Sequence, residues 1–508
     1  MNYRLVAKYI GYFSFAMGLV MLPSMLWAVY FAEWDALIAF ALSMAVACVL
    51  GGGLAIAGRS APEQMWQREA LTLVSVSWFV AAFLGAFPFI FGGVLGPVDA
   101  FFESMSGFTT TGSTVIQDIE AVPRSILFWR SMTQWLGGVG IVVLFIAVLP
   151  YLGAGGKQLF RSESSGPDPH GLSPRIKDTA SILYKIYGGF TIAMTVALMA
   201  FGMTFFDALC HTMSTLSTGG FSPLQDSIGA YNHAAIEIVV IIGMIVGGTS
   251  FALFFVMLRK DRLAPLRDTE WKAYIGILAI AFALIAINLA SGAHQSQDGV
   301  AAEPYSVGHS IRAAAFHTVS ILTGTGFITE DFDRWPSFSR VLLFTLMFVG
   351  ACAGSTAGGI KIVRIVILVK MAYWRVENTF RPKTIRAVRI SNQVIDDDTR
   401  RSVHSFFVIY IAWFVLGSLI MAALGLPFES ALASVAATLN NIGPGLGLVG
   451  ATQDFSHVPG VGKLFLSLCM VLGRLELFSI CVLFVPGFWT HSCTRSRAHH
   501  RLRIERIR

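Results

Sequence analysis

The stretch FTTTGSTV, residues 108–115, follows the segment DAFFESMSG (99–107) and lies between two long apolar runs. Its three threonines and its glycine interrupt a hydrophobic region at a point where an ordinary helix would not continue. The chain of 508 residues is 55% hydrophobic and 13% charged, and its mean hydropathy is +0.66. Because a soluble globular protein carries about 25% charged residues, this composition indicates a membrane protein.

Apolar runs that are long enough to cross a bilayer recur along the whole chain. A membrane-spanning helix needs about 20 predominantly apolar residues, so the sequence predicts about ten spans. The runs begin near Leu5, Ala36, Leu71, Ile126, Ile182, Ala235, Ala273, Val341, Val403 and Leu464.

The distribution of charge predicts how these spans are oriented. Acidic residues dominate every second connection, and the positive-inside rule places the basic connections and both termini in the cytoplasm. This topology also explains the net charge of +7, so we expect contacts with membrane lipid and none with nucleic acid. Lys and Arg are concentrated in 59–68, 157–185, 259–272, 370–401 and 495–508.

The opening stretch belongs to a segment that occurs four times. DAFFESMSGFTTTG (99–112) aligns without gaps with DALCHTMSTLSTGG (207–220), AAAFHTVSILTGTG (313–326) and SALASVAATLNNIG (430–443). Every copy ends in glycine and lies between two apolar runs. The repeating unit is therefore a helix, a short segment and a second helix, and the first two runs of the chain stand outside it.

Each short segment is too short to cross the membrane. About ten helical residues rise only about 15 Å, half of the hydrocarbon core, so the chain must enter and leave on the same side. Irregular backbone at this depth is tolerated only where protein buries it or where it lines a water-filled cavity. We expect Asp99, Asp207, Ser310 and Ser430 to be the N-caps of the four short helices.

Four such loops around one axis are typical of a selectivity filter, in which backbone carbonyl oxygens replace the hydration shell of a cation. Glycine permits the positive φ angles that such backbone needs. A single copy would favour close helix packing, but four gapless copies favour the filter. The predicted ion-binding residues are Thr110, Thr111, Gly112, Thr218, Gly219, Gly220, Thr325, Gly326, Asn441, Ile442 and Gly443.

The predicted fold is an all-α integral membrane protein. Four tandem helix–pore loop–helix repeats surround one pseudo-fourfold pore, and two extra transmembrane helices precede them. The expected division is residues 1–65 for the N-terminal pair, 66–155, 156–260, 261–375 and 376–490 for the four pore repeats, and 491–508 for a basic cytoplasmic tail.

The four loops, together with QWLGGVGIVVLFIAVLP (134–150) and GACAGSTAGGIKIVR (350–364), resemble motifs of the Trk/Ktr/HKT superfamily of potassium transporters. The two extra N-terminal spans resemble its TrkH/TrkG branch. The resemblance covers nearly the whole chain and implies potassium uptake across the bacterial inner membrane, K+ as the transported ion, one pore per chain and a homodimer. It also implies a separate cytoplasmic TrkA-like nucleotide-binding subunit, and no organic cofactor is expected in this chain.

Alternative functions remain at this point. Relatives that favour sodium often carry serine in place of the first filter glycine, so Gly112 favours potassium, although a weakly selective or sodium-conducting channel of the same fold stays open. Two departures from the family pattern, TGTGF in the third loop and Ala357 in AGSTAGG, leave the aligned filter glycine in place. A secondary solute transporter typically pairs inverted repeats, whereas these repeats share one orientation. No clustered catalytic groups indicate an enzyme.

The run from 341 to 374 is too long for one span, and GACAGSTAGG interrupts it. Broken backbone at membrane depth borders a cavity, and the resemblance places this stretch beneath the filter. We therefore predict a mobile gate, with a passive kink as the alternative. Its residues are Gly350, Gly354, Ser355, Thr356, Gly358 and Gly359.

Arg474 lies within an apolar run, about 16 Å along a helix from Lys463. A charge at this depth is costly and should face a cavity or a partner. The resemblance places Arg474 at the narrow point of the pore beside the gate, where its charge opposes cation passage. The alternative is an arginine that binds backbone carbonyl groups.

Two histidines, His211 and His317, share one position of the pore-helix alignment. This position lies several residues before the filter glycine. We expect both side chains to form hydrogen bonds behind the filter, and tuning of the outer pore by pH is the alternative.

Overall fold

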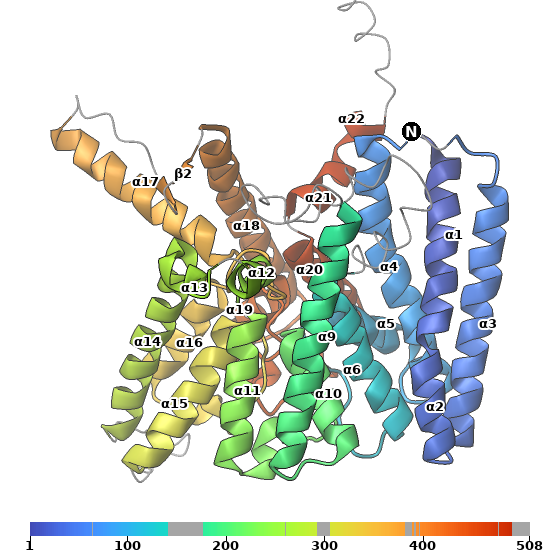
Figure 1. Cartoon of the computed structure of the whole chain (residues 1–508), viewed down its shortest axis with the longest axis horizontal. Coiled ribbons are helices and arrows are strands. Elements are labelled where there is room, and N and C mark those ends of the chain that lie inside the picture. Colours follow the sequence, from blue (N-terminus) through green and yellow to red (C-terminus); the bar gives the residue numbers. More distant parts are fainter. Residues whose placement is uncertain are drawn as a thin grey trace, which may run out of the picture.

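The structure is a computed structural model of the whole chain. Its long helices lie side by side in one bundle (Figure 1). The predicted basic tail 491–508, residues 141–150 of the motif after the first loop, and residues 157–175 lie outside the described part. The structure describes residues 1–62, 65–140, 176–259, 261–291, 305–381, 389–390, 393–395, 397–475 and 477–489.

An N-terminal helical pair precedes the repeats, as predicted. The first span consists of α1 (Tyr3–Val20) and α2 (Leu22–Tyr30), and α3 (Trp34–Ala57) returns beside it. The pair packs closely through glycine: a Cβ on Gly11 would lie 2.6 Å from the carbonyl oxygen of Gly51. Only residues without a side chain permit this approach of two backbones.

Each repeat consists of a long first helix, a pore helix and a second helix. The first helices are α4 (Gln67–Phe91), α9 (Ile176–Ala200), α14 (Thr269–Ala290) and α18 (Asp397–Ala423). The pore helices are α5 (Pro97–Phe108), α10 (Phe205–Leu216), α15 (Val307–Leu322) and α19 (Phe428–Leu439). The second helices are α6 (Arg124–Val139), α11 (Ala234–Gly247), α16 (Ser337–Met347) and α20 (Gly460–Arg474).

Shorter elements complete the fold. Strands β1 (Arg389–Ile390) and β2 (Gln393–Val394) form a minimal antiparallel pair in the otherwise helical chain. The remaining α-helices are α12 (Phe251–Arg259), α13 (Ala264–Arg267), α17 (Ile362–Phe380), α21 (Leu477–Cys481) and α22 (Pro486–Trp489). The 3-10 helices are η2 (Ser227–Tyr231), η3 (Phe332–Arg334), η4 (Gly447–Val449) and η5 (Val482–Phe484).

Six helices of the described chain are long and apolar enough to span a membrane, or seven spans if one bent pair is counted. The other predicted runs, which begin near Ile126, Ala235, Val341 and Leu464, form the second helices of the repeats. The second helices are shorter than a full span, and α11 and α12 meet at a bend of 95°. The predicted number of about ten includes these second helices in addition to the long ones.

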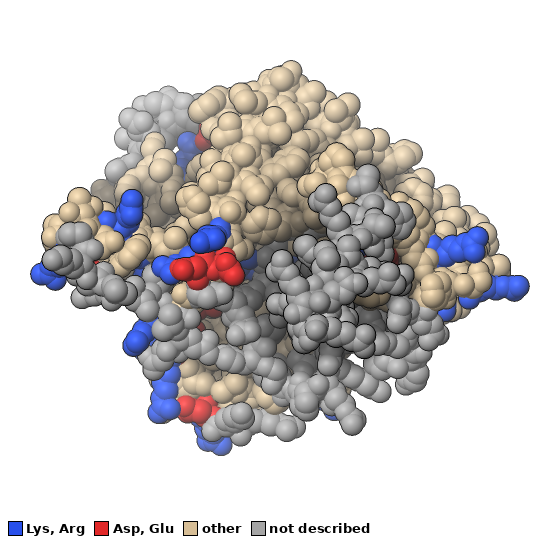
Figure 2. All heavy atoms as spheres, turned by 90° about the horizontal axis from the view of Figure 1, so that it is seen from above, with Lys and Arg blue, Asp and Glu red and all other residues tan. Residues whose placement is uncertain are grey.

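Basic side chains predominate at one end of the bundle. The N-terminus and α22 lie at one end, and the pore-helix labels lie toward the other (Figure 1). Figure 2 looks onto the first of these ends, where Lys and Arg side chains outnumber Asp and Glu. The acidic residues Asp118 and Asp333 lie in the connections that follow the first and third pore helices.

The predicted N-caps of the pore helices are wrong. Each pore helix begins earlier, so that the predicted residues lie in its first turns. The hydroxyl oxygen of Thr204 accepts from the backbone N–H of Asp207 at 3.2 Å, and an acidic side chain in a first turn is already favourable without being the cap. The observed N-caps are Gly96, Thr204, Ser306 and Pro427.

Candidate selectivity filter and gate

The four loops adopt the same backbone conformation at equivalent positions. The twelfth and fourteenth residues of every aligned segment have positive φ angles, a conformation that is uncommon for residues other than glycine. Gly324 occupies the twelfth position in the third loop, where glycine adopts this conformation without strain, and this accounts for the TGTGF departure. The pairs are Thr110 and Gly112, Thr218 and Gly220, Gly324 and Gly326, and Asn441 and Gly443.

The loops form a closed ring through their glycines. A Cβ added to Gly112 would overlap the carbonyl oxygen of Gly219 in the second loop. Additions at the next glycines would overlap the carbonyl oxygens of the third and fourth loops in turn, and a Cβ on Gly443 would lie 2.8 Å from the carbonyl oxygen of Thr111 in the first loop. The fourth loop thus closes on the first, and the predicted pseudo-fourfold arrangement is confirmed.

The carbonyl groups of this ring come from the residue that precedes each filter glycine: Thr111, Gly219, Thr325 and Ile442. All the predicted filter residues therefore lie together. The amide of Asn441 donates to Thr111 Oγ1 at 2.9 Å, and the Ser113 hydroxyl donates to the carbonyl oxygen of Gly443 at 3.0 Å. A ring of main-chain carbonyl oxygens of this kind is suited to a dehydrated monovalent cation.

A buried ion pair behind the ring was not predicted from the sequence. Arg130 Nε donates to Glu103 Oε1 at 2.7 Å, and the side chains are 2% and 0% exposed. Glu103 accepts from the backbone N–H of Val115 at 2.9 Å, while Arg130 donates to the carbonyl oxygen of Ser222 at 3.0 Å. The ion pair joins the two extended segments that follow the first and second filter glycines. The signal was available, since Arg130 is a charge inside the run that begins near Ile126.

We predict that Glu103→Gln lowers the free energy of unfolding by about 3–5 kcal/mol, because it leaves the buried guanidinium of Arg130 without a counter-charge. The double variant Glu103→Gln with Arg130→Met should recover much of this loss. Unfolding temperatures of the purified variants in detergent measure both effects. A double variant that is less stable than the single one would contradict this account.

Gln134 is a second residue whose role the sequence did not reveal. Its Nε2 donates to the carbonyl oxygen of Gly219 at 2.6 Å, and its Oε1 accepts from the backbone N–H of Phe221 at 3.0 Å. The side chain is fully buried. Helix α6 of the first repeat therefore holds the second loop on both sides of Gly220. Gln134 opens the QWLGGVG motif, and only the ring geometry identifies its target.

Both aligned histidines form hydrogen bonds behind the filter, as predicted. His211 Nδ1 lies 2.8 Å from the carbonyl oxygen of Asp207, and its Nε2 lies 3.1 Å from Ser222 Oγ. His317 Nδ1 and Nε2 each lie 3.1 Å from a carbonyl oxygen. Both rings are fully buried. Each histidine joins its pore helix to the segment that follows the filter glycine of the same loop.

The predicted gate residues form a loop between α16 and α17. Thr356 donates from its backbone N–H to the carbonyl oxygen of Gly247 at 3.2 Å and from Oγ1 to that of Leu216 at 2.9 Å. A Cβ on Gly358 would lie 2.8 Å from the carbonyl oxygen of Asn440. This part of the loop therefore lies against the second and fourth filter segments.

The middle of the gate loop contacts the bend between α11 and α12. The carbonyl oxygen of Gly354 accepts from the N–H of Phe251 at 3.1 Å, at the bend between α11 and α12. The Ser355 hydroxyl donates to the carbonyl oxygen of Cys352 at 2.6 Å, inside the loop itself. The positive φ angles of Gly350, Gly354 and Gly359 are +71°, +73° and +78°. These glycines give the segment its course without a helix.

Arg474 ends α20 beside this loop. Its Nη1 donates to the carbonyl oxygen of Thr356, and its Nη2 donates to those of Gly137 and Gly138, the latter at 3.3 Å. The guanidinium thus joins the loop to the end of α6. The position beside the loop agrees with the prediction, and the alternative of carbonyl binding also applies.

On the outer side, the fourth loop is held from the third repeat. Asp333 Oδ2 accepts from the backbone N–H of Gly447 at 3.0 Å, and its Oδ1 lies 3.7 Å from Arg340 Nη2. Burial raises the pKa of Asp333 to about 6, while the charge of Arg340 opposes this shift and those of Asp331 and Glu429 add to it.

This shift predicts a pH dependence of stability. Because the folded pKa exceeds the ordinary value of 3.8, the contribution of Asp333 is fully present below that value and is lost as pH rises through about 6. Asp333→Asn should therefore flatten the fall of the unfolding temperature with pH between about 4 and about 6. An unchanged slope in this variant would assign the pH dependence to other groups.

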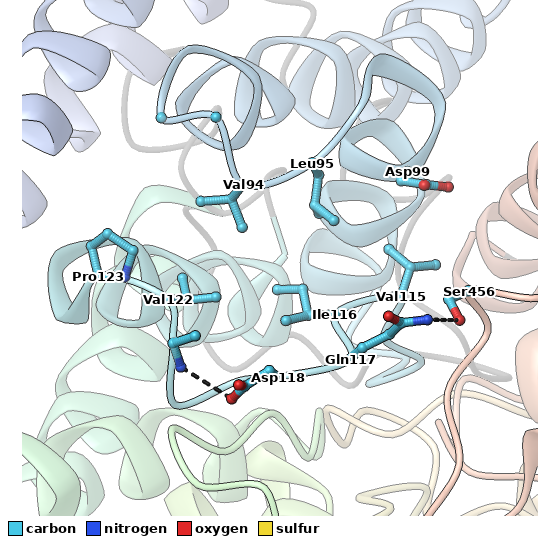
Figure 3. Close-up of a pocket in the computed structure, with 13 residues that line it drawn as sticks. Val94, Leu95, Asp99, Val115, Ile116, Gln117, Asp118, Val122, Pro123 and Ser456 are labelled. Atoms are coloured by element: carbon cyan, nitrogen blue, oxygen red, sulfur yellow. Dashed lines mark hydrogen bonds between the residues drawn. The ribbon is translucent and has the colours of Figure 1, made fainter.

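A cavity of about 600 Å³ opens beside residues 115–118, the segment that follows the first filter loop (Figure 3). Val94 and Leu95 line it from the turn before α5, and Pro123 lines it from the turn before α6. Gln117 closes one side, where its Nε2 donates to Ser456 Oγ at 2.9 Å. No filter glycine lines this cavity, so it is distinct from the carbonyl ring.

Comparisons with known proteins agree with this geometry. A family profile described as TrkH, a cation transport protein, matches residues 37–490. The Trk system potassium uptake protein TrkH of Halomonas elongata is 37% identical over 495 residues, which cover 96% of this chain and 100% of the relative. The Trk system potassium uptake protein TrkG of Escherichia coli is 33% identical over 490 residues, 96% of this chain and 98% of the relative.

A solved structure is similar over the same length. The crystal structure of the potassium transporter TrkH from Vibrio parahaemolyticus matches with a TM-score of 0.86 and 33% sequence identity. The match covers 96% of this chain and 100% of that chain. The similarity therefore includes the N-terminal pair as well as the four repeats.

Proposed function

The chain belongs to the TrkH family of cation transport proteins, and we propose that it takes up potassium through the ring of four filter loops. The observation that carries this proposal is the closed ring, in which each filter glycine lies against the carbonyl oxygen of the next loop. Carbonyl oxygens arranged in this way replace the water that a cation loses on entry. The chain is thus a transporter and not an enzyme.

Potassium is favoured over sodium by two features. Gly112 keeps the first loop free of a side chain at the ring, and relatives named potassium uptake proteins cover the chain end to end. A weakly selective or sodium-conducting pore of the same fold is the second candidate. A secondary solute transporter accounts less well for four equivalent loops of one orientation.

The loop from Gly350 to Gly359 is proposed to be the gate, together with Arg474. Thr356 supports this role, because it touches the end of a pore helix and also accepts from the guanidinium of Arg474. A loop that is held by backbone contacts and glycines can move without unfolding a helix. In the proposed gate the arginine charge would repel a cation that leaves the filter.

The assembly is proposed to be a homodimer in the bacterial inner membrane, with both termini in the cytoplasm. A cytoplasmic TrkA-like nucleotide-binding subunit would dock on the basic connections 157–185, 259–272 and 370–401. The names of the relatives, which place them in a Trk system, support such a partner. The division into four pore repeats, with boundaries near residues 66, 156, 261 and 376, belongs to the same proposal.

The test is cation flux into proteoliposomes that contain the purified chain alone. We expect uptake of potassium and rubidium to exceed uptake of sodium. Equal sodium and potassium fluxes would retain the pore and reject the selectivity. Absence of all cation flux, both alone and with a nucleotide-binding subunit added, would reject the proposed function.

A further inference from the structure

The outer ends of the repeats are joined by ion pairs at three of the four seams, where the second helix of one repeat meets the pore helix of the next. Between repeats 2 and 3, Glu237 of α11 binds Arg312 of α15 through two contacts of 2.6 Å. Between repeats 4 and 1, Lys463 of α20 donates to Asp99 of α5 at 2.6 Å. Between repeats 3 and 4, Arg340 of α16 pairs with Glu429 of α19.

These ion pairs follow one pattern. Glu237, Arg340 and Lys463 are each the fourth residue of their helix. Their partners Arg312 and Glu429 directly precede the aligned pore segment, and Asp99 is the first residue of its segment. The equivalent of Asp99 in the second segment, Asp207, accepts from the Thr204 hydroxyl of its own helix end instead. The pattern therefore predicts the residues that should pair at the remaining seam, between α6 of the first repeat and α10 of the second.

That remaining seam is apolar at both positions. The fourth residue of α6 is Leu127, and the residue that precedes the second aligned segment is Phe206. Both are buried, at 4% and 6% exposure. The guanidinium of Arg124 lies 6.0 Å from the centre of the Phe206 ring, as a cation–π contact. No ion pair joins α6 and α10 among the described residues.

The N-terminal pair fills this seam with aromatic rings. Trp27 of α2 lies 5.2 Å from Phe206 of α10 and 5.8 Å from Phe128 of α6, measured between ring centroids. Phe31, directly after α2, lies 5.5 Å from Phe206 and 5.1 Å from the guanidinium of Arg124. Such contacts join three elements that are remote in the sequence.

A carboxylate of the same corner caps α6. Glu33 accepts from the backbone N–H groups of Arg124 at 2.7 Å and Ser125 at 3.0 Å, and from the Ser125 hydroxyl at 2.5 Å. These are first-turn groups that a helix cannot satisfy internally. The corner between α2 and α3 therefore fixes the outer end of α6, and Figure 1 shows α2 at the end opposite the N-terminus.

Helix α6 carries this constraint to the filter. Arg130 and Gln134, later on the same helix, bind the carbonyl oxygens of Ser222 and Gly219 on either side of the second filter glycine. A continuous helix transmits a displacement of its end over this distance of about 15 Å. The contacts thus form an unbroken path from Glu33 to the carbonyl ring.

We propose that Trp27, Phe31 and Glu33 are positioning residues of the pore, which replace at the seam between repeats 1 and 2 the ion pair that joins the other three. The N-terminal pair is then a part of the ion-selective apparatus and not only a membrane anchor. This inference rests on the proposed function, because its readout is the selectivity of the ring.

The test compares potassium and sodium flux in proteoliposomes for Trp27→Ala, Glu33→Gln and the wild type. Each variant should lower the potassium-to-sodium flux ratio by about three- to tenfold, since remote coupled positions change such equilibria by about 0.5–2 kcal/mol. Trp27→Phe should retain the ratio. The matched control is Leu26→Ala on the same helix, whose side chain is 71% exposed, and it should behave as wild type.

A further variant tests whether another seam also positions the ring. Glu237→Gln breaks the ion pair at another seam and should lower the flux ratio in the same direction. Should Trp27→Ala fail to fold, Glu33→Gln and Trp27→Phe carry the comparison. Variants that lose potassium and sodium flux in equal proportion, or keep the wild-type ratio in a folded protein, would overturn the inference. A wild type without cation flux would instead reject the proposed function itself.

Discussion

Replacement of Gly112 by serine should reduce the preference for potassium over sodium by about tenfold or more, the effect of about 1.4 kcal/mol in relative ion affinity. A Cβ at this position overlaps the carbonyl oxygen of Gly219, so the first two loops must separate. The φ angle of +85° adds backbone strain of about 1–3 kcal/mol for any residue with a side chain. Both effects displace oxygens of the ring.

Gly93→Ser is the matched control for this experiment. Gly93 has a similar φ angle of +68°, but nothing lies within 4 Å of an added Cβ. The control therefore carries the backbone strain without the overlap, and its flux ratio should equal that of the wild type. If Gly112→Ser retained wild-type selectivity while folded, the ring at the first loop could not be the element that discriminates between ions. Equal losses in both variants would attribute the effect to strain alone.

Much of this site could be predicted because short contiguous segments of the sequence carry its pattern. The fourfold repeat depends on gapless alignment of short segments, and glycine at the last position of each copy indicates a backbone that other residues avoid. The structure brings the four predicted filter glycines, and the residue that precedes each of them, into one ring. It also places Thr356 and Arg474 in contact, which agrees with the position beside the gate that the family resemblance implied for Arg474.

The residues that were missed depend on which repeat lies beside which. Glu103 and Arg130 belong to one repeat but bind the strands of two loops, and Gln134 serves the loop of the next repeat. The pattern of residues in a single sequence does not show which repeats lie side by side in the folded protein. The break after α16 was predicted from the length of the run 341–374, but the bend of 95° between α11 and α12 was missed, since hydropathy measures the length of an apolar run and not its continuity.

The wrong N-caps have a simpler cause. A sequence pattern places an acidic or hydroxyl residue near a helix start, but the cap and the first turn favour similar residues. Thr204 caps the second pore helix, and Asp207, which was predicted, lies in its first turn and accepts from the Thr204 hydroxyl at 2.7 Å. Helix ends are thus located less accurately than helices.

Replacement of Arg474 by alanine should raise basal cation flux through the purified chain by about tenfold. The variant removes the positive charge beneath the ring and also the contacts to Thr356 and to Gly137 and Gly138 that hold the gate loop to the end of α6. Both losses favour the open pathway. Rubidium uptake into proteoliposomes, without any nucleotide-binding subunit, measures the effect.

Arg474→Lys separates the two contributions. A lysine keeps the charge but lacks the planar fork that binds several carbonyl oxygens at once. If repulsion of the cation dominates, this variant should remain as closed as the wild type; if the contacts dominate, its flux should approach that of Arg474→Ala. Unchanged or abolished flux in a folded Arg474→Ala protein would remove the arginine from the gate. It would leave the carbonyl contacts of Arg474 as structural bonds between α20, α6 and the loop.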